Sequence, residues 1–178
     1  MTAIAPDAAL VLARPGETTG TFLRGVEARP FRCALGRSGI VPGRAKREGD
    51  GATPEAVLPL RRLLFRADRL ARPRATVPAE PIAPDDLWCD DASAPEYNRP
   101  VRAPFGPSHE RLWMEEPLYD LVGVLGWNDD PPVPGRGSAI FLHLARPGLA
   151  PTEGCIALPL PDLLAVLPGL RVIEVRLE

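Results

Sequence analysis

Three features of the sequence predict a mostly β protein, a sandwich or flattened barrel with one or two short helices. The chain of 178 residues contains 23 prolines and 16 glycines, which interrupt helices and mark turns. Several short stretches are rich in apolar and β-branched residues, as strands are. Only two stretches have a helical pattern. A chain of this length can bury its own core, so we expect a single domain over residues 1–178.

The expected strands are distributed along the chain and are separated by turns. In order they are residues 9–14, 21–26, 31–36, 118–127, 138–145 and 171–177. The last, RVIEVRL, alternates apolar and charged residues, which is typical of a half-exposed strand. Between the third and fourth strands, residues 72–108 are rich in proline. We expect this region to be a long irregular excursion on the surface, not a linker between domains.

The clearer helix candidate is PLPDLLAVLPG, residues 159–169. Prolines stand at its start, Asp162 lies near the first turn, and Pro168 and Gly169 end it. The second candidate, LPLRRLLFRADRL over residues 58–70, fits a helix or, equally, a strand followed by a turn.

Charge and hydropathy argue against several classes of protein. The formal net charge is -2, and basic and acidic residues are mixed along the whole length. A nucleic-acid or membrane-surface protein would concentrate one sign of charge. No apolar run approaches the roughly 20 residues that a membrane-spanning helix needs. The start, MTAIAPDAALVLARPGE, lacks a basic segment followed by a long apolar one, so no signal peptide is visible.

The three cysteines do not form an even disulfide framework, and none belongs to a C-x-x-C pair. Structural zinc is therefore not expected. Cys33 has the character of a small buried apolar residue on a strand. Cys89, beside an aspartate pair, has no cationic partner in sequence and is expected to be structural or incidental. One disulfide with one free thiol remains an alternative to three free thiols.

The stretch HLARPGLAPTEGCIAL places His143 at the end of an expected strand and Cys155 after a short loop. A nearby imidazole can take the proton of a thiol and stabilise the thiolate, which makes the cysteine a nucleophile. Gly154 leaves space for a substrate carbonyl, and backbone N–H groups around it could face a developing oxyanion. The alternative is that both residues are buried and only flank a loop. A metal site that adds Glu153 matches no common ligand spacing.

SAIFLH followed by TEGCIAL resembles the catalytic signature of the L,D-transpeptidases, which have the YkuD-type fold. The resemblance covers His143 as the base, Cys155 as the nucleophile, and Thr152 and Gly154 before the cysteine. CALGRSGI, KREGDGATPEAVLPL and YDLVGVLGWN resemble other elements of the family in the same order. Together these pieces span roughly residues 30–177.

The signature is reduced compared with that of the family. Glu153 stands where a second histidine is usual, Ala157 stands where arginine or asparagine is usual, and the loop is shorter. We expect these changes to affect substrate recognition, with Arg146 or Arg136 in place of the missing arginine. Tyr119 either lines the cleft or belongs to the core.

The resemblance implies acyl transfer on peptidoglycan stem peptides that contain diaminopimelate, with no metal or organic cofactor. The bond attacked joins an L residue to a D residue, which leaves 1,3 crosslinks from L-Ala and 3,3 crosslinks from diaminopimelate as alternatives. We expect a monomer in the periplasm or cell envelope, with a role in cell-wall biogenesis and cell shape. The rival functions are an L,D-carboxypeptidase or endopeptidase and a non-catalytic wall-associated interaction domain.

Overall fold

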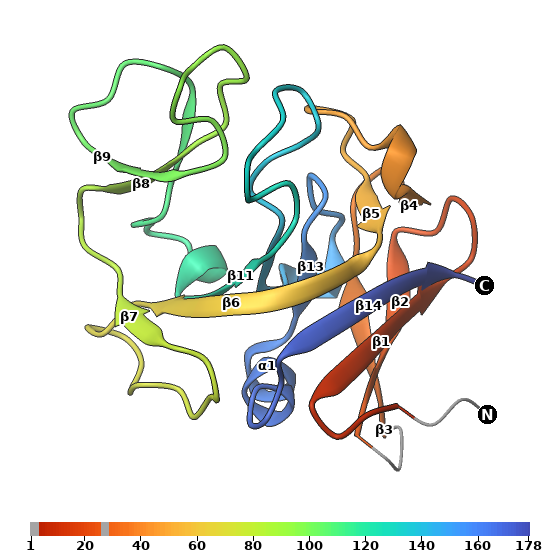
Figure 1. Cartoon of the computed structure of the whole chain (residues 1–178). Coiled ribbons are helices and arrows are strands. Elements are labelled where there is room, and N and C mark those ends of the chain that lie inside the picture. The colour runs from red at the N-terminus through yellow and green to blue at the C-terminus, as the bar shows by residue number, and fades with distance from the viewer. Residues whose placement is uncertain (1–3, 26–28) are drawn as a thin grey trace.

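The computed structural model describes residues 4–25 and 29–178, and most of its regular structure is β (Figure 1). The mostly β class is therefore confirmed. Residue 26, at the end of the strand expected over 21–26, lies outside the described residues. The strands of the main sheet are β1 (Ala8–Ala13), β2 (Thr19–Arg24), β3 (Arg29–Ala34), β6 (Val57–Phe65), β7 (Ala79–Pro81), β11 (Leu121–Leu125), β12 (Phe141–Leu144), β13 (Ile156–Leu158) and β14 (Val172–Leu177).

The main sheet closes on itself. Its order is β11-β12-β13-β3-β2-β1-β14-β6-β7, and β6 also pairs with β11, which joins eight of the strands into a ring. β1 and β14 are parallel, as are β12 and β13, whereas β1, β2 and β3 follow one another antiparallel. Closure removes the unpaired edges that an open sheet would expose.

Alternating side chains fill the interior of the ring. Ala9, Val11 and Ala13 of β1 are buried while their neighbours are partly exposed, and β14 buries Ile173 and Val175 in the same way. The alternation expected over residues 171–177 is confirmed. These side chains belong to one apolar cluster, the barrel core, together with buried residues of the other ring strands.

The helix expected over residues 159–169 is present as α1 (Leu160–Val166). Pro161 lies in its first turn, and Leu163 and Val166 pack into the barrel core. The ambiguous stretch over residues 58–70 is the long strand β6, so the strand interpretation was the right one. Tertiary pairing decides this, because β6 is bonded to β11 along one part and to β14 along another.

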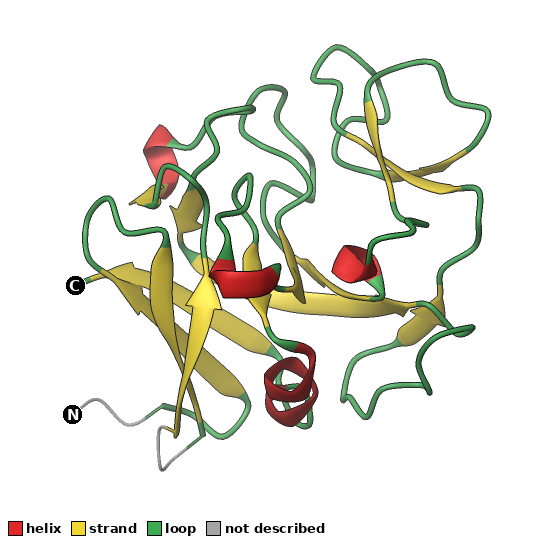
Figure 2. Cartoon of the chain, turned by 180° about the vertical axis from the view of Figure 1, so that it is seen from behind, coloured by secondary structure: helices red, strands yellow, loops and turns green. Residues whose placement is uncertain are grey.

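Residues 66–120, which we name the connecting segment, join β6 to β11. In Figure 1, β7 of this segment lies against β6 at the left, whereas β8 and β9 stand apart from the ring at the upper left. Seen from behind, the same loops and short strands lie beside the ring (Figure 2). The prediction that residues 72–108 are irregular was wrong, because they include three short strands. The segment contains β7 and a separate three-stranded sheet of β8 (Asp86–Cys89), β9 (Pro100–Arg102) and β10 (His109–Arg111). The prolines alone predicted irregular structure, but residues distant in sequence pair here as strands.

A second apolar cluster joins the connecting segment to the outer face of β11 and β12. Trp88, Leu112 and Tyr119 come from the segment, and Val122 and Phe141 come from the ring. The aromatic side chains of Trp88 and Phe141 make an edge-to-face contact, with 5.1 Å between their centroids. This cluster therefore covers the part of the ring from which the cavity described below is built.

Shorter elements complete the structure. β4 (Ile40–Pro42) and β5 (Thr53–Glu55) form a parallel pair, and single 3-10 turns occupy η1 (Gly43–Ala45), η2 (Pro117–Tyr119) and η3 (Pro147–Leu149). Within the described residues, no helix has the length and apolar character needed to cross a bilayer.

Candidate active site

The parallel pairing of β12 and β13 brings His143 and Cys155 onto one face of the ring. Leu142 pairs with Ile156 and His143 with Ala157, so Cys155, just before β13, lies beside Phe141. Successive strand residues point to opposite faces, which puts Phe141 and His143 on the same side. Cys155 and His143 both line a cavity of about 890 Å³ between the ring and the connecting segment.

The thiol of Cys155 is buried and held from two sides. The backbone N–H of Phe141 donates to Sγ at 3.3 Å, and the thiol donates to the carbonyl of Ala139 at 3.2 Å. Ala139 has a φ of 52°, which is uncommon for a residue with a side chain. Burial raises the pKa of Cys155 to about 12, and the charge of Glu110 adds to the rise. At neutral pH the residue is therefore a thiol in the free protein.

The imidazole of His143 is fixed through its inner nitrogen. Nδ1 lies 2.9 Å from the carbonyl oxygen of Leu144. A carbonyl oxygen only accepts hydrogen bonds, so Nδ1 carries the proton and Nε2 keeps a free lone pair. Burial lowers the pKa of His143 to about 4; Arg146 adds to the fall. The imidazole is therefore neutral at pH 7.

The loop before the cysteine is shaped by Thr152. Its Oγ1 donates to the carbonyl of Cys155 at 2.7 Å and accepts from the N–H of Gly154 at 3.1 Å. Gly154 has a φ of 133°, and a Cβ on it would lie 2.8 Å from the carbonyl oxygen of Ala52. The glycine is thus required by close backbone packing. Its N–H, considered above for an oxyanion, is engaged by the threonine hydroxyl in this structure.

A comparison with protein-family models matches residues 9–172 to YkuD, the L,D-transpeptidase catalytic domain. The chain belongs to this family. The matched range includes both His143 and Cys155 and the whole connecting segment. L,D-transpeptidases of this family act on peptidoglycan in the cell envelope and typically depend on a cysteine. Comparisons with curated proteins and with solved structures found no match.

Three of the four residues expected to bind substrate line the cavity: Arg146, Glu153 and Tyr119. Arg146 follows β12 and is exposed, and Glu153 lies beside the nucleophile loop. Glu153 pairs with Arg37, Nε to Oε2 at 2.8 Å, with both side chains largely exposed. Tyr119 is buried and packs edge-on against His143, with ring centroids 5.4 Å apart. It therefore belongs both to the cavity wall and to the second apolar cluster.

Arg136 is placed elsewhere. It is not among the residues that line the cavity, and its Nη2 donates to the carbonyl of Gly43 at 3.1 Å. Its own carbonyl accepts from the indole N–H of Trp127. The structure thus brings Arg146, and not Arg136, together with the cysteine and the histidine.

Sequence reasoning missed two residues of the connecting segment that contact the site. Glu110, in β10, lines the cavity and accepts a hydrogen bond from the Tyr119 hydroxyl at 2.5 Å. Asn98 is buried, and its Oδ1 accepts from the N–H of Ala139 at 3.0 Å and from the indole of Trp88 at 3.0 Å. Both precede β11 by many residues, and neither belongs to a local motif that would have marked it.

Over the described part of the chain, no three His, Cys, Asp or Glu side chains are grouped as ligands of a metal ion. Cys155 and His143 instead supply a thiol and a proton acceptor to the same cavity, with the thiol hydrogen-bonded to the carbonyl of Ala139. Such a pair can form and resolve a covalent acyl intermediate.

Proposed function

We propose that this member of the L,D-transpeptidase family crosslinks peptidoglycan stem peptides through an acyl-enzyme on Cys155. The observation that supports the proposal is the placement of Cys155 and His143 on one face of paired strands, in one cavity. The tautomer of His143 fixed by Leu144 leaves Nε2 free to accept a proton.

In the first half-reaction, the thiol of Cys155 passes its proton to Nε2 of His143 while Sγ attacks the carbonyl carbon of an L residue. The thioester bond forms, and the peptide bond to the following D residue breaks. The imidazolium then gives its proton to the departing amine. Burial favours the neutral form of both groups, so the pair starts as a thiol and an imidazole, and the thiolate forms only in the course of the reaction.

In the second half-reaction, the amine of a neighbouring stem attacks the thioester. An amide forms, the carbon–sulfur bond breaks, and Cys155 regains its proton. Attack by water instead would make the protein a carboxypeptidase or endopeptidase. Transfer to an amine is proposed over hydrolysis because the family to which the chain belongs is that of the L,D-transpeptidases.

Arg146 is the cation that we propose for substrate carboxylates, because it lines the cavity and is exposed. Glu153 and Tyr119 complete the proposed substrate-binding wall, and Thr152 and Gly154 set the position of the nucleophile. The donor bond remains open within the proposal: L-Ala to D-Glu leads to 1,3 crosslinks, and diaminopimelate to D-Ala leads to 3,3 crosslinks.

Incubation with purified muropeptides, followed by liquid chromatography and mass spectrometry, tests the proposal. We expect dimers joined through diaminopimelate, lost in Cys155→Ala and kept in Cys33→Ala, a buried thiol of the barrel core. A 1,3 enzyme releases the stem beyond L-Ala, and a 3,3 enzyme releases D-Ala. Shortened monomers without dimers would identify a hydrolase. No reaction, and no labelling of Cys155 by a carbapenem, would leave the non-catalytic interaction domain.

A further inference from the structure

In the second half-reaction the acceptor ammonium loses two protons, and Cys155 and His143 together can take up only one of them. An amine acceptor enters as an ammonium ion at neutral pH, because its pKa of about 10 lies well above 7. It carries three protons on nitrogen, and the amide product keeps one. One of the two lost protons returns to Cys155 through His143. The other needs a second acceptor, which hydrolysis by water does not require.

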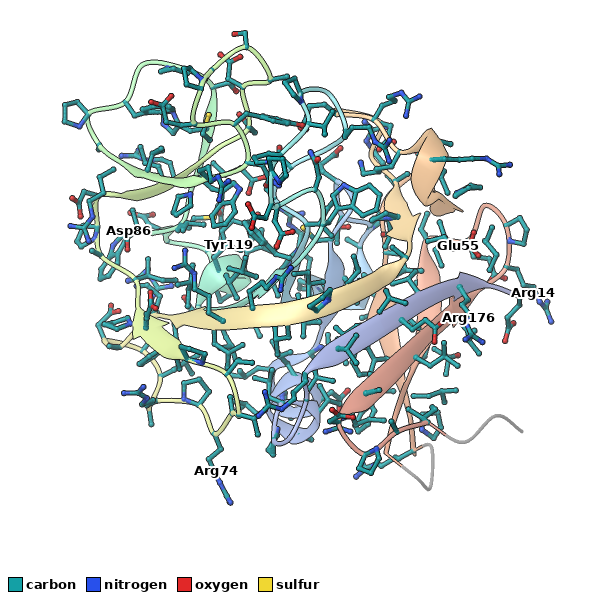
Figure 3. The ribbon with its side chains drawn as sticks, viewed as in Figure 1. Arg14, Glu55, Arg74, Asp86, Tyr119 and Arg176 are labelled. Carbon is teal, nitrogen blue, oxygen red and sulfur yellow. The ribbon has the colours of Figure 1, made fainter. Side chains whose placement is uncertain are left out.

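Glu110 is a carboxylate in the same cavity. It lies on β10, opposite Trp88 of β8, and it lines the cavity together with Cys155 and His143. The Tyr119 hydroxyl donates to its Oε2 at 2.5 Å, and the ring of Tyr119 packs against the imidazole of His143. One side chain therefore connects the carboxylate to the proposed base. Figure 3 shows Tyr119 on the side that carries the connecting segment, away from Glu55 and Arg176.

We propose that Glu110 binds the ammonium group of the acceptor and takes its first proton. This inference rests on the proposed function above. The ammonium gives one proton to the Glu110 carboxylate and becomes a neutral amine. The amine nitrogen then attacks the thioester carbon, and the carbon–sulfur bond breaks. The second proton passes through Nε2 of His143 to Sγ, and the Glu110 carboxyl releases its proton to solvent.

The surroundings of Glu110 suit this role. Desolvation raises its pKa, with Asp90 and Glu48 adding to the rise and the Tyr119 hydroxyl opposing it. A carboxylate with a raised pKa is a stronger proton acceptor than an exposed one. The charged or titratable groups that line the cavity with Glu110 are Glu48, Asp90, Arg111, Glu115, Glu116, Tyr119, His143, Arg146, Glu153 and Cys155, with Lys46 acting on Cys155 through its charge.

The test separates acylation of Cys155 from the capture of the acyl group. Wild type and Glu110→Gln are acylated with a donor stem peptide, and acylation is followed by intact mass. The acyl-enzyme is then offered Nα-acetyl-lysine, whose ammonium has a pKa of about 10.4, or hydroxylamine, which is mostly uncharged at neutral pH. Acylation should not slow, because removal of the Glu110 charge lowers the pKa of Cys155, and capture by hydroxylamine should stay unchanged. Capture by acetyl-lysine should fall about 100-fold.

A pH profile adds a readout that a purely structural role would not change. In Glu110→Gln, capture by acetyl-lysine should rise with pH as free amine accumulates, and should approach the wild-type rate near pH 10. Tyr119→Phe keeps the ring but removes the hydroxyl that holds Glu110, so it should lower the same rate by a smaller factor. Glu116→Gln removes an exposed carboxylate at the cavity edge and should have no acceptor-selective effect.

Equal losses of acylation and capture, or equal losses with both acceptors, would overturn the inference. So would an unchanged rate with acetyl-lysine. If Glu110→Gln does not fold, judged by its thermal unfolding, Tyr119→Phe gives the same comparison. A wild-type protein that is never acylated overturns the proposed function first, and this inference with it. Normal acylation without acceptor selectivity overturns the inference alone.

Discussion

The ring of strands and the connecting segment build the cavity in different ways. The ring supplies His143 and Cys155, whose relative position follows from the backbone pairing of β12 with β13. The segment supplies Glu110, Tyr119 and Asn98, each held by individual side-chain contacts. Backbone pairing is shared among many residues, whereas a side-chain contact depends on one. Apart from His143 and Cys155 themselves, we therefore expect substitutions in the barrel core to act mainly on stability, and those in the second apolar cluster and the segment to act on reactivity as well.

Two adjacent residues of β12 give the sharpest version of this comparison. Leu142 is fully buried in the barrel core, and Phe141 points the other way into the second cluster. Leu142→Ala should lower the free energy of unfolding by about 2–5 kcal/mol, because it leaves a cavity in the core. Phe141→Leu should cost less, about 1–3 kcal/mol, and should change the alkylation rate of Cys155. Urea denaturation and thiol labelling measure the two effects. A larger loss of stability for Phe141→Leu would break the distinction.

Much of the ring could be predicted from the sequence because its signals are local. Alternation in RVIEVRL, the apolar run before His143, and the Pro and Gly residues around α1 each predict an element without knowledge of its partner. β6 could not be decided, since its pattern fits both a helix and a strand and only its two neighbouring strands select one. The small sheet of the connecting segment was missed for the same reason: its strands are three or four residues long and lie in a proline-rich background.

The candidate site likewise contains residues that local sequence motifs predict and residues that only the topology brings together. His143 and Cys155 belong to motifs that lie close together in the chain, so their pairing could be proposed from the sequence alone. Arg146 and Arg136 are both near in sequence, yet only Arg146 lines the cavity, because Arg136 turns to the carbonyl of Gly43. Glu110 lines the cavity because β10 pairs with β8. Tyr119, at the end of η2, then donates a hydrogen bond to it. Such contacts depend on topology and leave no local pattern.

The burial of His143 under the connecting segment predicts a dependence of stability on pH. Its pKa is about 4 in the folded protein, below the usual value of about 6.5 in the unfolded chain. The unfolded chain therefore binds a proton first as the pH falls from 6.5 to 4. Stability contributed by the neutral imidazole is present above pH 6.5 and should decrease by about 3 kcal/mol over that range.

Urea denaturation of wild type and His143→Gln at several pH values measures this effect. The difference between the two free energies of unfolding should shrink as the pH falls, while His109 contributes equally to both proteins and cancels. A constant difference between pH 7 and pH 4 would mean that the segment does not desolvate the imidazole. The connecting segment would then have no influence on the protonation of His143.

Asn98 tests how far the segment controls the thiol. Its Oδ1 holds the N–H of Ala139, whose carbonyl accepts from Cys155, and its Nδ2 donates to the carbonyls of Trp127 and Asn128. Asn98→Gly removes these bonds without opposing its φ of 55°. We expect a loss of about 1–3 kcal/mol from unpaired buried groups, and an altered rate of Cys155 alkylation.

Asn128→Gly is the matched control for that change. Asn128 also has a positive φ, of 47°, but it is partly exposed, so water can replace its hydrogen bonds. Its loss of stability should be smaller, and the alkylation of Cys155 should stay unchanged. If both variants alter alkylation equally, Asn98 has no special part in positioning the thiol.

The smallest effect is expected at the ion pair of Arg37 and Glu153, which joins two loops of the ring at the cavity edge. Nε and Oε2 are 2.8 Å apart, but the side chains are 51% and 75% exposed. Water and salt screen such pairs, so their contribution to stability is about 0–1 kcal/mol. A double-mutant cycle of Arg37→Ala and Glu153→Gln, followed by urea denaturation, should give a coupling energy below about 1 kcal/mol that decreases further at high salt. A larger coupling, insensitive to salt, would show that the position of the nucleophile loop depends on this contact as well as on Thr152, and that side-chain contacts control the ring half of the site as they control the segment half.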